Sequence, residues 1–164
     1  MRARPFFAAL FLIPVAALAA GLIYFQGVLE LLPCPLCVAQ RIAFLGVASV
    51  ALVAFLHNPG GVWSRRSYAA AAGLFAAAGL FIALRQVWFI NHPETSLACG
   101  VSPEEKFLNS LPLSRWWPQM FEAMGDCLEV GWTFMGFGIP EWAALLFAAL
   151  ILLAVAAGVA PRDV

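Results

Sequence analysis

The stretch FFAALFLIPVAALAAGLIYFQGVL, residues 6–29, contains no charged side chain. A helix of this length, at about 1.5 Å per residue, crosses a hydrocarbon core of about 30 Å. Three further apolar stretches follow it along the chain, at 38–56, 68–89 and 141–160. The pattern predicts an all-α membrane protein, a four-transmembrane-helix bundle formed by a single integral membrane domain over residues 1–164.

The composition agrees with this prediction, because 63% of the residues are hydrophobic and only 11% are charged. Soluble domains contain about 25% charged residues. The formal net charge is zero, and no basic patch interleaved with polar readout residues is present. We therefore expect the lipid bilayer, and no nucleic acid, among the partners.

The first stretch also has features of a secretory signal peptide, namely Arg2 and Arg4 before the apolar run and the small residues at 17–20. The apolar part of a signal peptide is about 7–15 residues long. This run continues to Leu29. We therefore expect an uncleaved membrane anchor.

Charge predicts the orientation of the spans. Basic residues gather in the two tails and in the loop at 57–67, as Arg2, Arg4, Arg65, Arg66 and Arg162, whereas the 90–140 loop is mainly acidic. The positive-inside rule places both termini and the 57–67 loop in the cytoplasm. The loops at 30–37 and 90–140 then lie outside, which for a bacterial inner membrane is the periplasm.

All four cysteines fall in the two outer loops, where disulfides persist. Cys34-Pro35-Leu36-Cys37 stands at the start of the second span, and Cys99 and Cys127 lie in the 90–140 loop. A pair with two intervening residues closes a small-loop disulfide and is prone to thiol exchange. Proline suits the first helical turn, so we expect the second span to begin at this motif, with its dipole favouring a thiolate.

Arg41 follows Cys37 by four residues and therefore projects from nearly the same helical face. A cation there would stabilise a Cys37 thiolate and bind an oxygen of an electron acceptor. The competing interpretation is an arginine that reaches the lipid headgroups. For Arg85, late in the third span, both interpretations fit equally well.

The 90–140 loop contains an aromatic segment that differs from the rest of it. Trp116, Trp117, Met120 and Phe121 can share one helical face, which predicts a short helix lying on the membrane surface. Such a helix would carry Cys127 towards the Cys34–Cys37 end of the bundle. The alternative is a loop that packs only on itself.

Several chemistries do not fit the cysteine spacing. A zinc site of paired CxxC knuckles is absent, and Val38 occupies the position where a c-type haem motif needs histidine. Two interpretations remain, a redox enzyme and a four-helix membrane scaffold protein with two passive structural disulfides. A bridge across two residues constrains little chain, which favours the enzyme. With no metal or flavin motif, a quinone beside Cys37 and Arg41 is the expected acceptor.

The motifs together resemble the disulfide bond formation protein B (DsbB) family over nearly the whole chain. They are Pro33-Cys34-Pro35-Leu36-Cys37 with Gln40-Arg41, Ala98-Cys99, Pro118-Gln119, Gly125-Asp126-Cys127, and then Trp132, Phe134, Gly136 and Pro140.

The resemblance implies a bacterial inner-membrane enzyme that reoxidises a DsbA-like thiol oxidase and reduces ubiquinone or menaquinone, with no metal. It implies redox-active disulfides Cys34–Cys37 and Cys99–Cys127, in which Cys99 is attacked by the partner, Cys127 then attacks Cys34, and Cys37 faces the quinone with Arg41. The family often has a histidine near the quinone late in the third span. Counting back from Cys99 puts Gln86 at that position.

Overall fold

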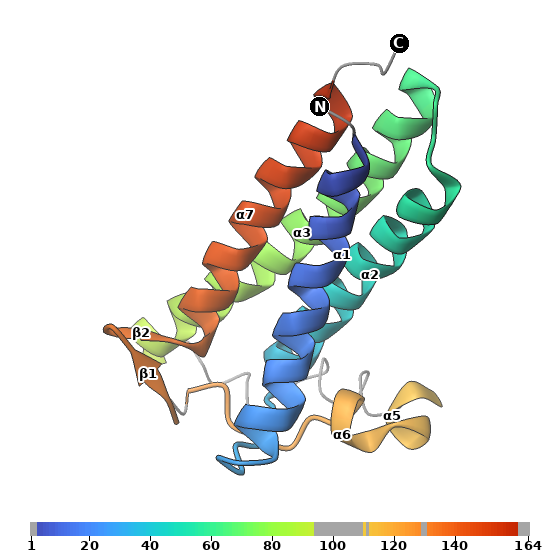
Figure 1. The fold of residues 1–164 in the computed structure, drawn as a ribbon. Helices are drawn as coiled ribbons and strands as arrows, with labels where there is room; N and C mark the ends of the chain where they lie inside the picture. Colours follow the sequence, from blue (N-terminus) through green and yellow to red (C-terminus); the bar gives the residue numbers. More distant parts are fainter. Residues whose placement is uncertain (1–2, 94–109, 111, 129–130, 161–164) are drawn as a thin grey trace.

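The computed structural model describes residues 3–93, 110, 112–128 and 131–160, and its four long helices lie side by side as a bundle (Figure 1). The helices are α1 (Ala3–Ala19), which continues as the π-helical segment η1 (Ala20–Gln26), α2 (Pro35–His57), α3 (Val62–Asn91) and α7 (Ile139–Val159). All four, with α1 and η1 counted as one, are long and apolar enough to cross a membrane. The predicted four-helix membrane fold is confirmed.

Two helices begin earlier than the apolar stretches predicted at 38–56 and 68–89. The second helix begins at Pro35 rather than residue 38, and the third begins at Val62 rather than 68, so that it includes Arg65 and Arg66 in its first turns. The turn between them starts at Asn58, whose left-handed backbone (φ 46°) ends α2 while its N–H bonds to the Ala54 carbonyl. The extent of the apolar stretches therefore underestimated the length of both helices at their N-terminal ends.

Small side chains let the helices approach closely. The buried alanines include Ala51 and Ala54 on α2 and Ala72, Ala76 and Ala83 on α3. Larger side chains fill the remaining space: Phe44 and Phe147 stack with their ring centroids 4.0 Å apart. Gly79 lies against the Phe147 ring, and the absence of a side chain at Gly79 leaves room for that ring between α3 and α7.

The two ends of the bundle differ (Figure 1). The start of α1, the end of α7 and the turn between α2 and α3 lie at one end. At the other end lie two short helices, α5 (Pro112–Trp116) and α6 (Pro118–Phe121), and a hairpin of β1 (Thr133–Phe134) and β2 (Phe137–Gly138). The cysteine motif at the start of α2 is at this second end.

The prediction of one surface helix with a shared aromatic face is wrong in detail. The segment breaks into α5 and α6 at Trp117, whose backbone (φ −142°, ψ 79°) is not helical. Pro118 explains the break, because a residue before proline disfavours the helical conformation. Met120 and Phe121 are buried, whereas Trp116 is 82% exposed. Met120 and Phe121 therefore pack against the protein, whereas the two tryptophans lie at its surface.

The hairpin before α7 was predicted only as loop. Its strands pair antiparallel, Thr133 with Gly138 and Phe134 with Phe137. Met135 and Gly136 both have positive φ, 54° and 83°, as a two-residue type I′ turn requires. The Trp142 indole N–H donates to the Phe134 carbonyl at 3.3 Å, which fixes the hairpin against α7.

The contact between Gly79 and Phe147 gives a test of the packing. A Cβ at Gly79 would collide with the Phe147 ring, so Gly79→Ala should destabilise the bundle. Overpacking of this kind costs about 1–3 kcal/mol. Gly60→Ala is the matched control, since a Cβ there meets nothing within 4 Å. Thermal unfolding in detergent should show a lower midpoint for Gly79→Ala only; equal midpoints would contradict this packing.

Candidate active site

The Cys34–Cys37 pair forms the beginning of α2. Cys34 is the N-cap in an extended conformation, and Pro35 occupies the first turn. The Cys37 N–H donates to Cys34 Sγ at 3.2 Å, so a sulfur replaces the oxygen of an ordinary cap. The two Sγ atoms lie 2.7 Å apart. The expectation that the second span begins at this motif is confirmed.

Backbone hydrogen bonds bring the segment before Cys127 against the segment before Cys34. Met124 N and Gly125 N both donate to the Pro33 carbonyl, each at 3.0 Å. The approach needs glycine, because a Cβ at Gly125 would collide with the Leu32 carbonyl oxygen. Two residues later, Cys127 is fully buried in a cluster with Cys34 and Leu36. The loop thus delivers Cys127 to the cysteine pair, as the sequence predicted.

The environment of Cys34 disfavours its thiolate. It bonds to Cys127 and to Cys37 and is buried, and these effects together raise the pKa of the Cys34 thiol. Cys37 is less enclosed and is half-buried. Because it lies in the first turn of α2, a negative charge on its sulfur would be stabilised by the positive end of the helix dipole.

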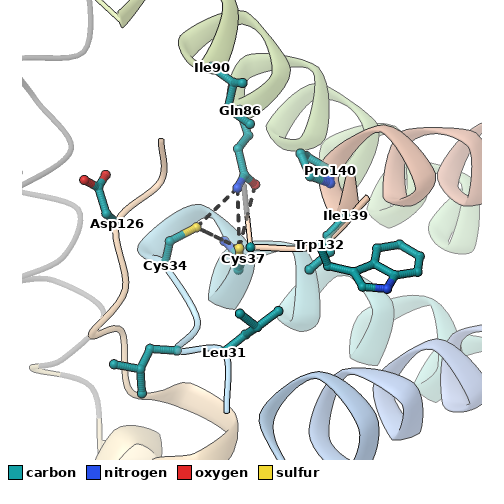
Figure 2. A pocket seen from close by; sticks show the side chains of 11 residues that line it. Leu31, Cys34, Cys37, Gln86, Ile90, Asp126, Trp132, Ile139 and Pro140 are labelled. Atoms are coloured by element: carbon teal, nitrogen blue, oxygen red, sulfur yellow. Dashed lines mark hydrogen bonds between the residues drawn. The ribbon is translucent and has the colours of Figure 1, made fainter. Parts of the chain in front are cut away.

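Gln86 reaches the pair from α3 (Figure 2). Its amide Nε2 lies 3.4 Å from Cys34 Sγ and 3.5 Å from Cys37 Sγ. Its Oε1 accepts a hydrogen bond of 2.8 Å from Gln40 Nε2 on α2. Both glutamines are buried. Gln86 therefore touches both sulfurs.

Arg41 connects three elements near the cysteine pair. Its Nη1 donates to Gln26 Oε1 on η1 at 3.0 Å and to the backbone carbonyls of Gln119 at 3.2 Å and Met120 at 3.5 Å on α6. These partners argue against a simple headgroup anchor. The guanidinium still acts on Cys37 through its charge, although the hydrogen bonds above go to other elements.

Two cavities meet at Cys37. The smaller, of about 70 Å³, is lined by Cys34, Cys37 and Gln86, with Asp126 and Trp132 at its rim (Figure 2). The larger, of about 220 Å³, lies among η1, α2 and α7 and is lined by Cys37, Gln40 and Arg41. The rest of its wall is apolar, with small residues on α1 and η1 and the rings of Phe25, Phe44, Trp132 and Trp142. An apolar cavity with a few convergent polar groups is typical of a small-molecule site.

The structure therefore brings together four predicted site residues, namely Cys34, Cys37, Cys127 and Gln86. Arg41 lines the larger cavity together with Cys37. Cys99 lies outside the described residues. Within the described part of the chain, no group of three His, Cys, Asp or Glu side chains could hold a metal ion. Gln40 was not predicted as a site residue, although a polar side chain three positions after Cys37 in an apolar span is a usable signal.

Comparison with known proteins agrees with this geometry. The family model for "Disulfide bond formation protein DsbB" matches residues 3–157. A "Disulfide bond formation protein B" of Nitrosospira multiformis is 48% identical over 140 residues, which is 85% of this chain and 82% of the relative. The protein of that name from Nitrosomonas europaea is also 48% identical, over 144 residues (85% and 87%). The one from Aromatoleum aromaticum is 40% identical over 153 residues (93% and 90%). With its cysteine motifs and four-helix fold, the chain belongs to the disulfide bond formation protein B family.

Proposed function

We propose that this chain is an inner-membrane protein-disulfide oxidoreductase that reoxidises a periplasmic DsbA-like thiol oxidase and passes the electrons to ubiquinone or menaquinone. One observation supports this above all: Cys127, from the second outer loop, is buried against Cys34, while Cys37 lines an apolar cavity. Two passive disulfides would not need a contact between the pairs. Family membership also favours the enzyme over the scaffold.

The proposed exchange conserves atoms and electrons. A thiolate of the reduced partner attacks Cys99 of the Cys99–Cys127 disulfide and releases Cys127, and the partner's second thiol then frees Cys99, so the partner leaves oxidised. Cys127 attacks Cys34 of the Cys34–Cys37 disulfide and releases Cys37 as a thiolate. Cys99 resolves the Cys34–Cys127 bond, which restores the loop disulfide and leaves Cys34 and Cys37 reduced.

The residues of the larger cavity fit a quinone. Its apolar wall suits a ring, and Arg41 and Gln40 offer the donors that a quinone oxygen needs. The quinone supplies the final oxidation by taking up two electrons and two protons. Cys37 provides the reducing sulfur at the cavity wall, and Arg41 holds positive charge beside it.

We also propose the predicted orientation, with one membrane domain over residues 1–164 and both termini in the cytoplasm. The start of α1 and the end of α7 lie at the end of the bundle opposite the cysteine pair (Figure 1). Arg65 and Arg66 lie at that same end, in the first turns of α3. By the positive-inside rule this end is cytoplasmic, so the cysteines face the periplasm.

Trapping the mixed disulfide tests the function directly. In Cys127→Ala, Cys99 is a free thiol that can attack the disulfide of an oxidised DsbA-like thiol oxidase. A Cys99–partner disulfide then forms, the partner's second cysteine leaves as a thiol, and no Cys127 thiol is present to displace the partner from Cys99. Membranes mixed with the oxidised DsbA-like thiol oxidase and quenched by alkylation should show this adduct on a non-reducing gel. Cys99→Ala is the control and should give none. Well-expressed Cys127→Ala without an adduct would favour the scaffold.

Gly125→Ala tests the contact between the loops. Its Cβ would push the loop from the Leu32–Pro33 backbone and move Cys127 away from Cys34. Displacement by about 1 Å can slow a reaction by about a hundredfold. Rapid alkylation should therefore show slower transfer from the loop pair to Cys34–Cys37, whereas Gly60→Ala should transfer at the parental rate. Unchanged transfer in Gly125→Ala would mean that the loop contact does not control this step.

Arg41→Met should raise the quinone KM by about ten- to a hundredfold, because a hydrogen bond to a charged group contributes about 1.5–3 kcal/mol. It should also slow transfer from Cys127, since Arg41 holds the α6 carbonyls. Arg41→Lys should be milder because it keeps the charge and loses the planar fork. Arg85→Met removes an arginine that stacks on Phe89 and should leave the KM unchanged. Wild-type quinone kinetics in Arg41→Met would move the acceptor site elsewhere.

A further inference from the structure

We propose that Gln86, oriented by Gln40, is a positioning residue that hydrogen-bonds to the Cys34 and Cys37 sulfurs and stabilises their reduced form over their disulfide. The role rests on the proposed function, in which this pair alternates between the two forms. Figure 2 shows the Gln86 side chain extending from α3 with its amide directed at both sulfurs.

The hydrogen-bond pattern fixes the orientation of the amide. Gln86 Oε1 accepts from Gln40 Nε2 at 2.8 Å, the shortest bond of the group. The two hydrogens of Gln86 Nε2 are then available for the two sulfurs, at 3.4 Å and 3.5 Å. A side-chain amide has two donor hydrogens and one acceptor oxygen, so every part of the Gln86 amide has a partner.

The two redox forms of the sulfurs differ in how well they accept a hydrogen bond. A thiolate carries a full charge, and hydrogen bonds to ionised groups are about twice as strong as those between neutral groups. A disulfide sulfur carries no charge and is a weak acceptor. Because Gln86 and Cys34 are buried, water does not replace the bond when it is lost. The amide therefore favours the reduced pair.

The nearest other polar groups already have partners in the structure. The hydrogen bonds of Arg41 described above go to Gln26 and to the carbonyls of α6. Asp126 lines the same small cavity, but its Oδ1 accepts from Leu128 N at 3.0 Å within its own turn. Besides the Cys37 N–H and Cys127, which bond to Cys34, the described side chain that hydrogen-bonds to both sulfurs is Gln86, whereas Arg41 acts on Cys37 by its charge.

A different role for the two glutamines is to hold α2 and α3 together. Interhelical amide bonds do stabilise helix pairs in membranes. That role concerns the stability of the bundle and is independent of the redox state of the cysteines. The two roles are therefore separated by measuring a redox equilibrium and an unfolding transition on the same variants.

The experiment uses the full chain with Cys99→Ala and Cys127→Ala, so that only the Cys34–Cys37 pair titrates. Quinone-free protein in detergent is equilibrated with graded ratios of reduced and oxidised dithiothreitol, and the oxidised fraction is read after alkylation. Adding Gln86→Met should shift the equilibrium towards the disulfide by about tenfold, which is about 30 mV for a two-electron couple. Gln86→His keeps a ring N–H donor and should recover part of the shift.

Two further variants complete the design. Gln40→Met leaves Gln86 in place but removes the group that orients it, so it should shift the equilibrium in the same direction by a smaller factor. If Gln86→Met fails to fold, the redox equilibrium of Gln40→Met tests the proposal in its place. Asn91→Ala removes an exposed amide of α3 whose bond is to the Val87 carbonyl, and it should not change the equilibrium.

The outcomes separate the two roles. Parental redox equilibria in Gln86→Met and Gln40→Met, with lower unfolding midpoints, would overturn the proposal and leave only a contact between helices. A shift as large in Asn91→Ala would also overturn it. The titration needs neither quinone nor partner, so it can fail while the proposed activity stands. A wild-type protein that cannot reduce quinone would remove the proposed function without changing these equilibria.

Discussion

The Pro33 carbonyl accepts two hydrogen bonds, from Met124 N and Gly125 N, and the geometry of the site depends on this contact. The carbonyl directly precedes Cys34, which caps α2. The two donors stand just before Cys127, which lies in the same buried cluster as Cys34. Each bond contributes only about 1 kcal/mol net. Their importance is positional, because they join loops that are distant in sequence immediately beside the sulfurs.

Several polar groups near the cysteine pair are satisfied across helices, and this couples the pair to the bundle. Arg41 on α2 bonds to η1 and α6, and Gln86 on α3 bonds to Gln40 on α2. Burying an amide or hydroxyl here without a hydrogen bond would cost about 2–7 kcal/mol. Loss of any of these bonds would therefore destabilise the folded protein. The contacts that stabilise the bundle are consequently the contacts that set the surroundings of Cys37.

The sequence predicted the features that depend on local properties. Long apolar stretches predicted the four spans, and Pro35 predicted the start of α2 at the cysteine motif. The break at Trp117 also has a local cause, because Pro118 follows it. The aromatic pattern predicted a continuous helix instead. The pairing of Gln40 with Gln86 could not be predicted in this way. It depends on which faces of α2 and α3 meet, and that is decided by packing between residues far apart in sequence.

The asymmetry between the two cysteines of the motif follows from this packing and supports their proposed order of reaction. Cys34 is covered by Cys127 and Leu36 and lines only the small cavity, whereas Cys37 lines both cavities. The sulfur of Cys127, on the segment after α6, therefore lies next to Cys34. A molecule in the apolar cavity meets Cys37, with the charge of Arg41 beside it. Because the amide of Gln86 contacts both sulfurs, it is placed to respond to reduction at either one.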